Sequence, residues 1–190
     1  MAIINKFELN LNTMINIFQY VNNRFLREQK ELVLSGVSER AWYTHFAIYF
    51  SRALNYFRIP RKYTVDTEYN RNQGKVKTIL DDTRNYEVIE VSCDLIIHSR
   101  GKCIEQDNLI CIEMKKSNRP EEEKIKDKNR VRILTKKSYN DMYSFDGKTL
   151  PEHVCGYILG VYFEVDIDKR NVYVEYYSSG EKIDSYILKF

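Results

Sequence analysis

The chain has 190 residues, of which 43% are hydrophobic and 30% are charged, and its formal net charge is +3 at pH 7. This length and apolar content suit one domain with a sizeable core, and no apolar run approaches the roughly 18–20 residues of a membrane span. The small positive charge permits a nucleic-acid partner without requiring one.

The N-terminus and the cysteines indicate a cytoplasmic protein. The first residues lack a basic stretch followed by an apolar one, so we expect no secretory signal. The four cysteines form no Cys-x-x-Cys pair, which argues against a zinc site and is typical of reduced thiols.

Two amphipathic helices are predicted in the first third of the chain. In residues 11–34, apolar side chains recur at helical spacing but bring no recognisable chemistry, so packing or an interface is the expected role. The second helix, residues 39–57, follows Ser38 as a suitable N-cap. Glu39 lies one turn before Trp42, on the same apolar stripe. An acid in the first turn is favoured by the helix dipole by about 0.3–1 kcal/mol, so this position alone suits a dipole role.

A strand and a polar segment follow. Residues 63–69 alternate β-branched and aromatic side chains, which predicts a strand, and Glu68 at its end is either solvated or lines a site. Residues 70–90 are polar, and an irregular loop is predicted. This loop is either an ordinary solvated one or a mobile one whose cations meet phosphates; these cations are Arg71, Lys75, Lys77 and Arg84.

The most informative stretch is residues 91–116, where two apolar runs carry charges. The first run contains Asp94, and after a polar connection at 99–107 the second run ends with Glu113 and Lys115. The short connection predicts a β-hairpin, and strand alternation puts Glu113 and Lys115 on one face. Isolated charges on an apolar sheet cost several kcal/mol, roughly, unless they are paired or hold a metal.

A third helix and further strands complete the predicted elements. Residues 121–139 begin with acids and end with lysines, which suits the dipole of a helix. The segment carries seven cations, Arg130 among them, and these form either a solvated face or a face that binds phosphates. Strands are predicted at 154–165, 172–177 and 183–190. The order predicts a mixed α/β fold with helices on a central sheet. We expect residues 1–190 to form a single domain with a helical extension (1–36), a core (38–165) and C-terminal strands (166–190).

Asp94 and Glu113 offer hard oxygen ligands, which favours magnesium or manganese. A divalent ion there would supply an activated water and neutralise charge on a phosphate. Lys115 would orient or deprotonate that water, or stabilise developing negative charge, and burial near a metal would lower its pKa. The alternative is a solvated strand, since Glu-x-Lys is common on exposed strands.

The sequence resembles the signature of the PD-(D/E)XK nuclease superfamily, which has the restriction-endonuclease-like fold. The resemblance lies in Cys93-Asp94, followed after eighteen residues by Glu113-Met114-Lys115. That fold has the core order helix, three-stranded meander, helix, strand (αβββαβ), similar to the order predicted over 39–165. Residues 38–41 and 68–71 also resemble the corresponding sequences of uncharacterised bacterial members of this superfamily. One departure is Cys93, which stands where the motif has proline.

The resemblance implies a metal-dependent nuclease that hydrolyses phosphodiester bonds, leaves a 5′-phosphate, and acts on DNA in defence against foreign DNA or in DNA processing. Asp94 and Glu113 would bind Mg²⁺ or Mn²⁺. The backbone carbonyl of Met114 and the carboxylate of Glu39 would complete the metal shell, and Lys115 would be catalytic.

Further residues are candidates for the same site. Glu68 and Arg71 are expected to line it, and the cations expected to contact nucleic acid are Lys116, Lys75, Lys77 and Arg130. Two other functions stay open. One is a catalytically inactive module of this fold that binds nucleic acid or a protein partner, and the other is an interaction protein that forms a homodimer through its first helix.

Overall fold

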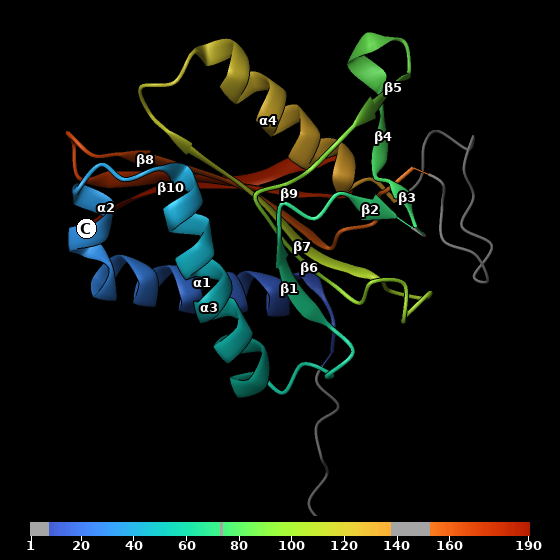
Figure 1. Ribbon diagram of the computed structural model, residues 1–190, viewed down its shortest axis with the longest axis horizontal. Helices are drawn as coiled ribbons and strands as arrows, with labels where there is room; N and C mark the ends of the chain where they lie inside the picture. The colour runs from blue at the N-terminus through green and yellow to red at the C-terminus, as the bar shows by residue number, and fades with distance from the viewer. Residues whose placement is uncertain (1–7, 73, 138–152) are drawn as a thin grey trace, which may run out of the picture.

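The computed structural model describes residues 8–72, 74–137 and 153–190, and its centre is a six-stranded mixed sheet flanked by helices (Figure 1). The strand order is β1-β6-β7-β8-β9-β10. The helices are α1 (Leu11–Glu28), α2 (Lys30–Leu34), α3 (Glu39–Tyr56) and α4 (Glu121–Leu134). The strands of this sheet are β1 (Thr64–Thr67), β6 (Leu95–His98), β7 (Asn108–Lys116), β8 (Leu159–Asp166), β9 (Asn171–Ser178) and β10 (Glu181–Lys189).

Apolar side chains on each sheet face decide which helices cover it. Alternate residues of β7, such as Ile112 and Met114, join a core with α1 and α3, whereas Cys111 joins a second core with α4. Figure 1 shows α1 and α3 on one side of the sheet and α4 on the other. The predicted mixed α/β architecture with helices on a central sheet is therefore confirmed.

The strand pairing follows the chain order. β1, β6 and β7 form an antiparallel meander, α4 then crosses over the sheet, and β8 returns parallel to β7. β9 and β10 extend the sheet by antiparallel pairing. The hairpin predicted over 91–116 is confirmed, although β6 starts only at Leu95, so Asp94 lies just before the strand.

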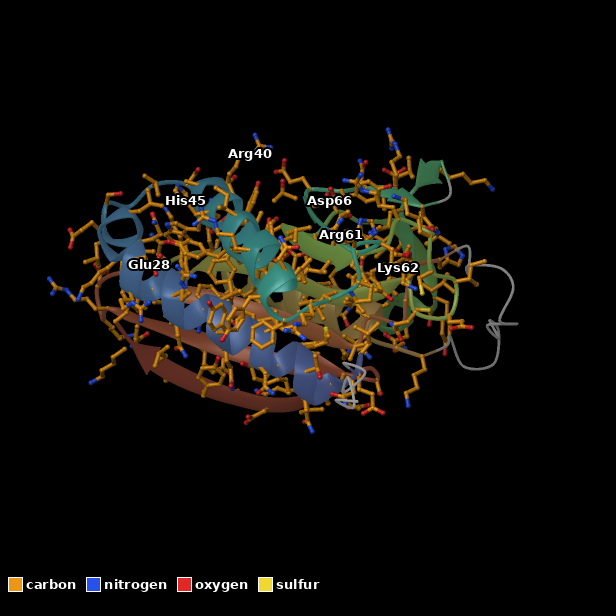
Figure 2. The ribbon with its side chains drawn as sticks, turned by 90° about the horizontal axis from the view of Figure 1, so that it is seen from below. Glu28, Arg40, His45, Arg61, Lys62 and Asp66 are labelled. Carbon is orange, nitrogen blue, oxygen red and sulfur yellow. The ribbon has the colours of Figure 1, made fainter. Side chains whose placement is uncertain are left out.

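The first helical segment is divided, not continuous as predicted over 11–34. α1 ends at Glu28, and Gln29 leaves helical geometry before α2 begins. The side-chain amide of Gln29 donates to the Tyr49 hydroxyl at 3.0 Å, and that hydroxyl donates to the Glu28 carboxylate at 3.0 Å. These bonds to α3 fix the chain direction where the helix breaks. Figure 2 shows Glu28 at the end of α1, with Arg40 and His45 on the neighbouring α3.

The prediction of an irregular loop over 70–90 is wrong. This segment contains the hairpin β2 (Arg71–Asn72) with β3 (Lys75–Val76), then β4 (Thr78–Asp81), a 3₁₀ turn η1 (Asp82–Arg84) and β5 (Glu87–Glu90). Ile79 and Leu80 are buried in the core that α4 covers. Strands this short, whose burial depends on a distant helix, leave little periodic signal.

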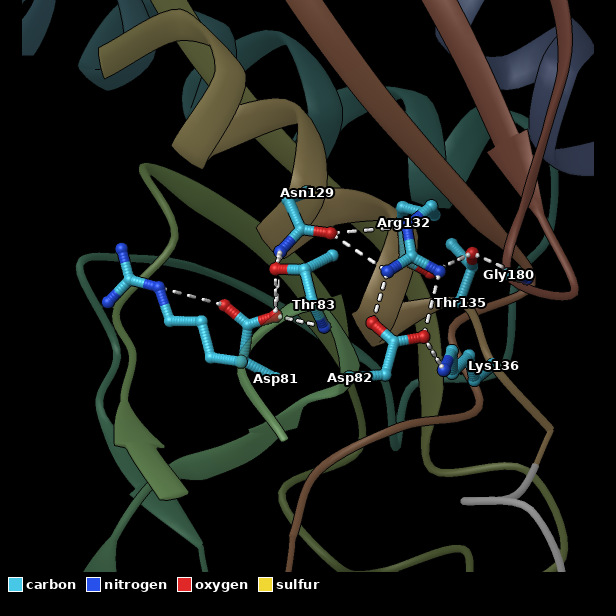
Figure 3. Close-up of polar contacts among 9 residues, drawn as sticks. Asp81, Asp82, Thr83, Asn129, Arg132, Thr135, Lys136 and Gly180 are labelled. Atoms are coloured by element: carbon cyan, nitrogen blue, oxygen red, sulfur yellow. Dashed lines mark hydrogen bonds and ion pairs between the residues drawn. The ribbon is translucent and has the colours of Figure 1, made fainter. Parts of the chain in front are cut away.

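Polar contacts attach η1 to the C-terminal half of α4 (Figure 3). Asn129 donates to Asp81 at 3.0 Å, and Arg132 and Lys136 both form ion pairs with Asp82. Asp81 and Asp82 therefore hold α4 and the residues that follow it against this segment.

Other predicted boundaries also shift. α4 ends at Leu134, and the last two residues of the helix predicted over 121–139 lie outside the described residues. Ile125 is 57% exposed and not part of the apolar stripe of α4. β8 starts at Leu159, later than predicted, and β10 starts at Glu181, earlier than predicted. All four cysteines are buried free thiols.

Gly160 marks the closest approach of β8 to α4. A Cβ atom at this position would lie 2.5 Å from Cγ1 of Val131 and 2.8 Å from Cγ2 of Thr135. We expect Gly160→Ala to lower the free energy of unfolding by about 1–3 kcal/mol, since the added methyl overpacks this contact. Urea unfolding measures the loss. Adding Val131→Ala should recover part of it, and a Gly160→Ala protein as stable as wild type would contradict the close contact.

Candidate active site

Asp94 lies across the end of the β6–β7 ladder. The last paired residues are Leu95 and Ile112, and beyond them the Asp94 Oδ2 atom accepts the backbone N–H of Met114 at 2.7 Å. The amide and carbonyl of one strand residue point the same way, so the carbonyl of Met114 also points toward the side where β6 has ended. The carboxylate and this carbonyl are thus oriented toward one region.

Glu113 and Lys115 share the face of β7 that α4 covers, as predicted. Glu113 is 3% exposed, and its Oε1 lies 2.6 Å from Nη1 of Arg130. The Nζ atom of Lys115 lies 2.7 Å from Oδ2 of Asp127. Arg130 also lies 3.2 Å from Asp127, its neighbour one turn earlier on α4. Two strand charges therefore meet two helix charges of opposite sign.

Asp127 was missed from the sequence, although a signal was present. It precedes Val131 by four residues and Leu134 by seven, which places it on the buried stripe of α4. An acid on such a stripe is costly unless it has a buried partner. Arg130 was expected to contact nucleic acid from a solvated face, but the structure places it against Glu113.

Burial and like charges make ionisation of Asp94 and Glu113 unfavourable. Burial raises the pKa of Asp94 to about 6, and the charge of Asp127 adds to the rise while the Met114 N–H and Lys115 oppose it. Burial likewise raises the pKa of Glu113 well above its usual range, against the attraction of Arg130. A cation between these acids would relieve both effects.

Lys115 behaves differently from the expectation based on burial alone. Burial lowers its pKa, but the ion pair with Asp127 outweighs burial, so the pKa is raised. The expected lowering overlooked this helix carboxylate. Lys115 is accordingly held as an ammonium group beside Glu113.

Glu39 reaches the end of β7 from the first turn of α3. Its Oε1 accepts the backbone N–H of Lys116 at 2.8 Å and lies 3.3 Å from Nε of Arg119. Its charge acts on both Asp94 and Lys115. The carboxylate thus borders the cluster while bonded to the strand end. Its role as a metal ligand stays a prediction.

Two other predicted residues lie at the rim. Glu68 donates its backbone N–H to the Asp94 carbonyl at 3.3 Å, while its side chain accepts from the Tyr43 hydroxyl at 2.6 Å and from Arg40. Lys116 turns away, since its Nζ donates to the Gly36 carbonyl at 2.8 Å.

The three remaining cations lie in the β2–β3 region. Arg71 and Lys75 are exposed, as expected for phosphate contacts. Arg71 was also expected to line the active site, but it lines a cavity with His98 and Asn108 at the other end of the β6–β7 hairpin. Lys77 is only 3% exposed, so it does not lie on a solvated loop surface as predicted. Its aromatic surroundings come from distant segments of the chain, which the local sequence does not reveal.

The donor set fits a hard divalent cation. Asp94 and Glu113 supply two carboxylates, within the one or two that magnesium takes from proteins, and Met114 offers a carbonyl oxygen. Among the described residues, the cations that face Asp94, Glu113 and Asp127 are Lys115 and Arg130, which leaves a negative balance when all five groups are ionised. Within residues 8–72, 74–137 and 153–190, no three His, Cys, Asp or Glu side chains form a ready-made metal-binding group.

A second buried acid on the α4 side of the sheet is unrelated to this cluster. Glu175 on β9 accepts from the Tyr173 hydroxyl at 2.6 Å and from Tyr177, and Lys182 and Lys128 lie 3.0 and 3.4 Å away. Burial would raise the pKa of Glu175, but these hydrogen bonds outweigh it and hold the pKa at about 2. The carboxylate therefore contributes to the stability of the sheet.

We expect Glu175→Gln to destabilise the protein by about 1–3 kcal/mol at neutral pH, because it removes charge-assisted hydrogen bonds. An unfolded glutamate has a pKa of about 4.3, above the folded value, so the carboxylate stabilises the fold above this pH. The difference from wild type should shrink as the pH falls from about 4.3 to 2. Urea unfolding across this range measures it, with the exposed Glu181→Gln as control. A pH-independent difference would contradict this.

The chain matches no protein-family model, no curated protein and no solved structure. In the part of the chain that the structure describes, the helices are too short or too polar to cross a membrane.

Proposed function

We propose that this protein is a metal-dependent nuclease that hydrolyses phosphodiester bonds in DNA. The observation that carries the proposal is the electrostatic interaction of Asp94, Glu113 and Lys115 at the end of the β6–β7 hairpin, where the charge of Asp94 disfavours ionisation of the buried Glu113. The order α3, β1-β6-β7 meander, α4 and parallel β8 supports a restriction-endonuclease-like core of the PD-(D/E)XK type.

Each residue has a distinct role in this proposal. Asp94 and Glu113, with the Met114 carbonyl, would hold Mg²⁺ or Mn²⁺, which when bound supplies an activated water and charge neutralisation. Lys115, kept as an ammonium group by Asp127 at 2.7 Å, stabilises negative charge that develops on the phosphate. Arg130 orients the Glu113 carboxylate from α4.

The test is incubation of the purified protein with supercoiled plasmid, linear duplex DNA, single-stranded DNA and RNA. Each substrate is offered with magnesium, with manganese and with a chelator. We expect cleavage of DNA only with metal, with 5′-phosphate ends, and none by Lys115→Met. If folded protein cuts none of these substrates, or cuts equally well in the chelator, the proposal fails.

One observation favours a second function, an inactive module that binds nucleic acid. Glu113 and Lys115 already have internal partners in Arg130 and Asp127, so their charges are balanced without a metal or a substrate. This module would bind nucleic acid in a salt-sensitive way, and binding would survive Lys115→Met while no substrate is cut.

A further inference from the structure

A polar cavity lies at the end of the β6–β7 hairpin that is opposite to Asp94. Its volume is about 70 Å³, and its lining includes Tyr69, Arg71, Lys77, His98, Arg100 and Asp107. His98 follows Asp94 by four residues, and Asn108 precedes Glu113 by five. At about 3.3 Å per strand residue, roughly 13–17 Å separate this cavity from the candidate active site.

Lys77 is a buried amine in this cavity, and burial lowers its pKa. Its Nζ lies 3.2 Å from the Tyr157 hydroxyl, and it lies 5.4 Å from the centre of the Tyr69 ring and 5.8 Å from that of Tyr157. Among the described residues, Lys77 forms no salt bridge with a carboxylate, and the nearby Asp66 pairs with His98 and Arg100 instead. A buried ammonium without an acid is costly, so an anion that enters the cavity would stabilise it.

The acids near the cavity are already bound to other groups. Asp66 on β1, labelled in Figure 2, lies 2.8 Å from Nε2 of His98 and accepts from both Nε and Nη2 of Arg100. Asp107 accepts the backbone N–H of Gly101 at 2.7 Å. The ion pair with Asp66 fixes Arg100 over the Tyr69 ring at 5.8 Å.

Two cations remain to attract a ligand. Lys77 is buried and Arg71 is exposed, and in the described ranges neither has a carboxylate at ion-pair distance. The cavity is small, at about 70 Å³, and polar groups line much of it, which suits a small oxyanion.

We propose that this cavity binds a phosphate group between the buried Lys77 and the exposed Arg71. The source of that phosphate rests on the proposed function: it would belong to the bound nucleic acid. The separation from the active site corresponds to about four to five steps of 3.4 Å along a duplex axis. Such a contact would set how far along the strand the cleaved bond lies.

The first test uses inorganic phosphate and no metal. In a buffer with a chelator, phosphate should raise the melting temperature of wild type above that in chloride of equal ionic strength. The rise should be lost in Lys77→Met and at least halved in Arg71→Gln, which changes an exposed residue and keeps the fold. It should persist in Arg61→Gln, an exposed residue outside this lining, and in Asp94→Asn, so a failed nuclease assay does not affect this test. Equal rises in wild type, Lys77→Met and Arg71→Gln would overturn the site.

The second test identifies the source of the phosphate. Binding of a fluorescent oligonucleotide is measured by anisotropy over a series of salt concentrations, again with chelator. Loss of one phosphate contact lowers the slope of log affinity against log salt by roughly 0.7–0.9. We expect this change in Arg71→Gln but not in Arg61→Gln. Equal slopes, with the melting-temperature shift intact, would support a free phosphate ligand and overturn the nucleic-acid assignment.

Discussion

Replacing Asp94 with asparagine is expected to lower the rate of metal-dependent phosphodiester cleavage by at least about 100-fold, as loss of a central electrostatic group does. The free energy of unfolding should not fall. Asparagine keeps an oxygen for the Met114 N–H and removes a charge that Asp127 and Glu39 repel. The measurements are kcat/KM on plasmid DNA and urea unfolding of the same samples.

A matched control separates the site from the charge change. Asp168→Asn alters an exposed residue of the turn between β8 and β9 and should cut DNA at the wild-type rate. Glu113→Gln should lose activity as Asp94→Asn does. An Asp94→Asn protein that cuts like Asp168→Asn would remove Asp94 from the mechanism.

Replacing Arg130 with methionine is expected to cost about 3–5 kcal/mol of stability, because it leaves a buried acid without its partner. The acid is Glu113, which is 3% exposed and lies 2.6 Å from the guanidinium group. Equilibrium urea unfolding gives the loss.

Two further variants test whether this loss belongs to the ion pair. Adding Glu113→Gln to Arg130→Met should restore most of the stability, since no buried charge then remains unpaired. Lys126→Met, an exposed change on the same helix, should have little effect. If Arg130→Met unfolds at the same urea concentration as Lys126→Met, Arg130 does not support Glu113.

The elements that carry the candidate site were predictable because their signals are local. Two long apolar runs joined by a polar turn specify the β6–β7 hairpin, and alternation alone places Glu113 and Lys115 on one face. The break at Gln29 was not predictable, because it depends on a hydrogen bond to Tyr49 twenty residues away. The burial of Ile79 and Leu80 likewise depends on α4.

The partners of the site residues were harder to predict than the residues themselves. Asp127 and Arg130 come from α4, and only the crossover over the sheet brings them to Lys115 and Glu113. The direction of the Lys115 pKa shift depends on this contact and was therefore wrong from sequence. Lys77 shows the same limit, since the tyrosines around it are Tyr69 and Tyr157.

The metal site is tested most directly by soaking crystals of the protein with Mn²⁺ and locating the manganese by its anomalous scattering. We expect a manganese ion in contact with the carboxylates of both Asp94 and Glu113, and its loss in crystals of Asp94→Asn. Crystals with no manganese there, in which Asp94 stays bonded to the Met114 N–H and Glu113 to Arg130, would contradict a metal-dependent active site at this hairpin.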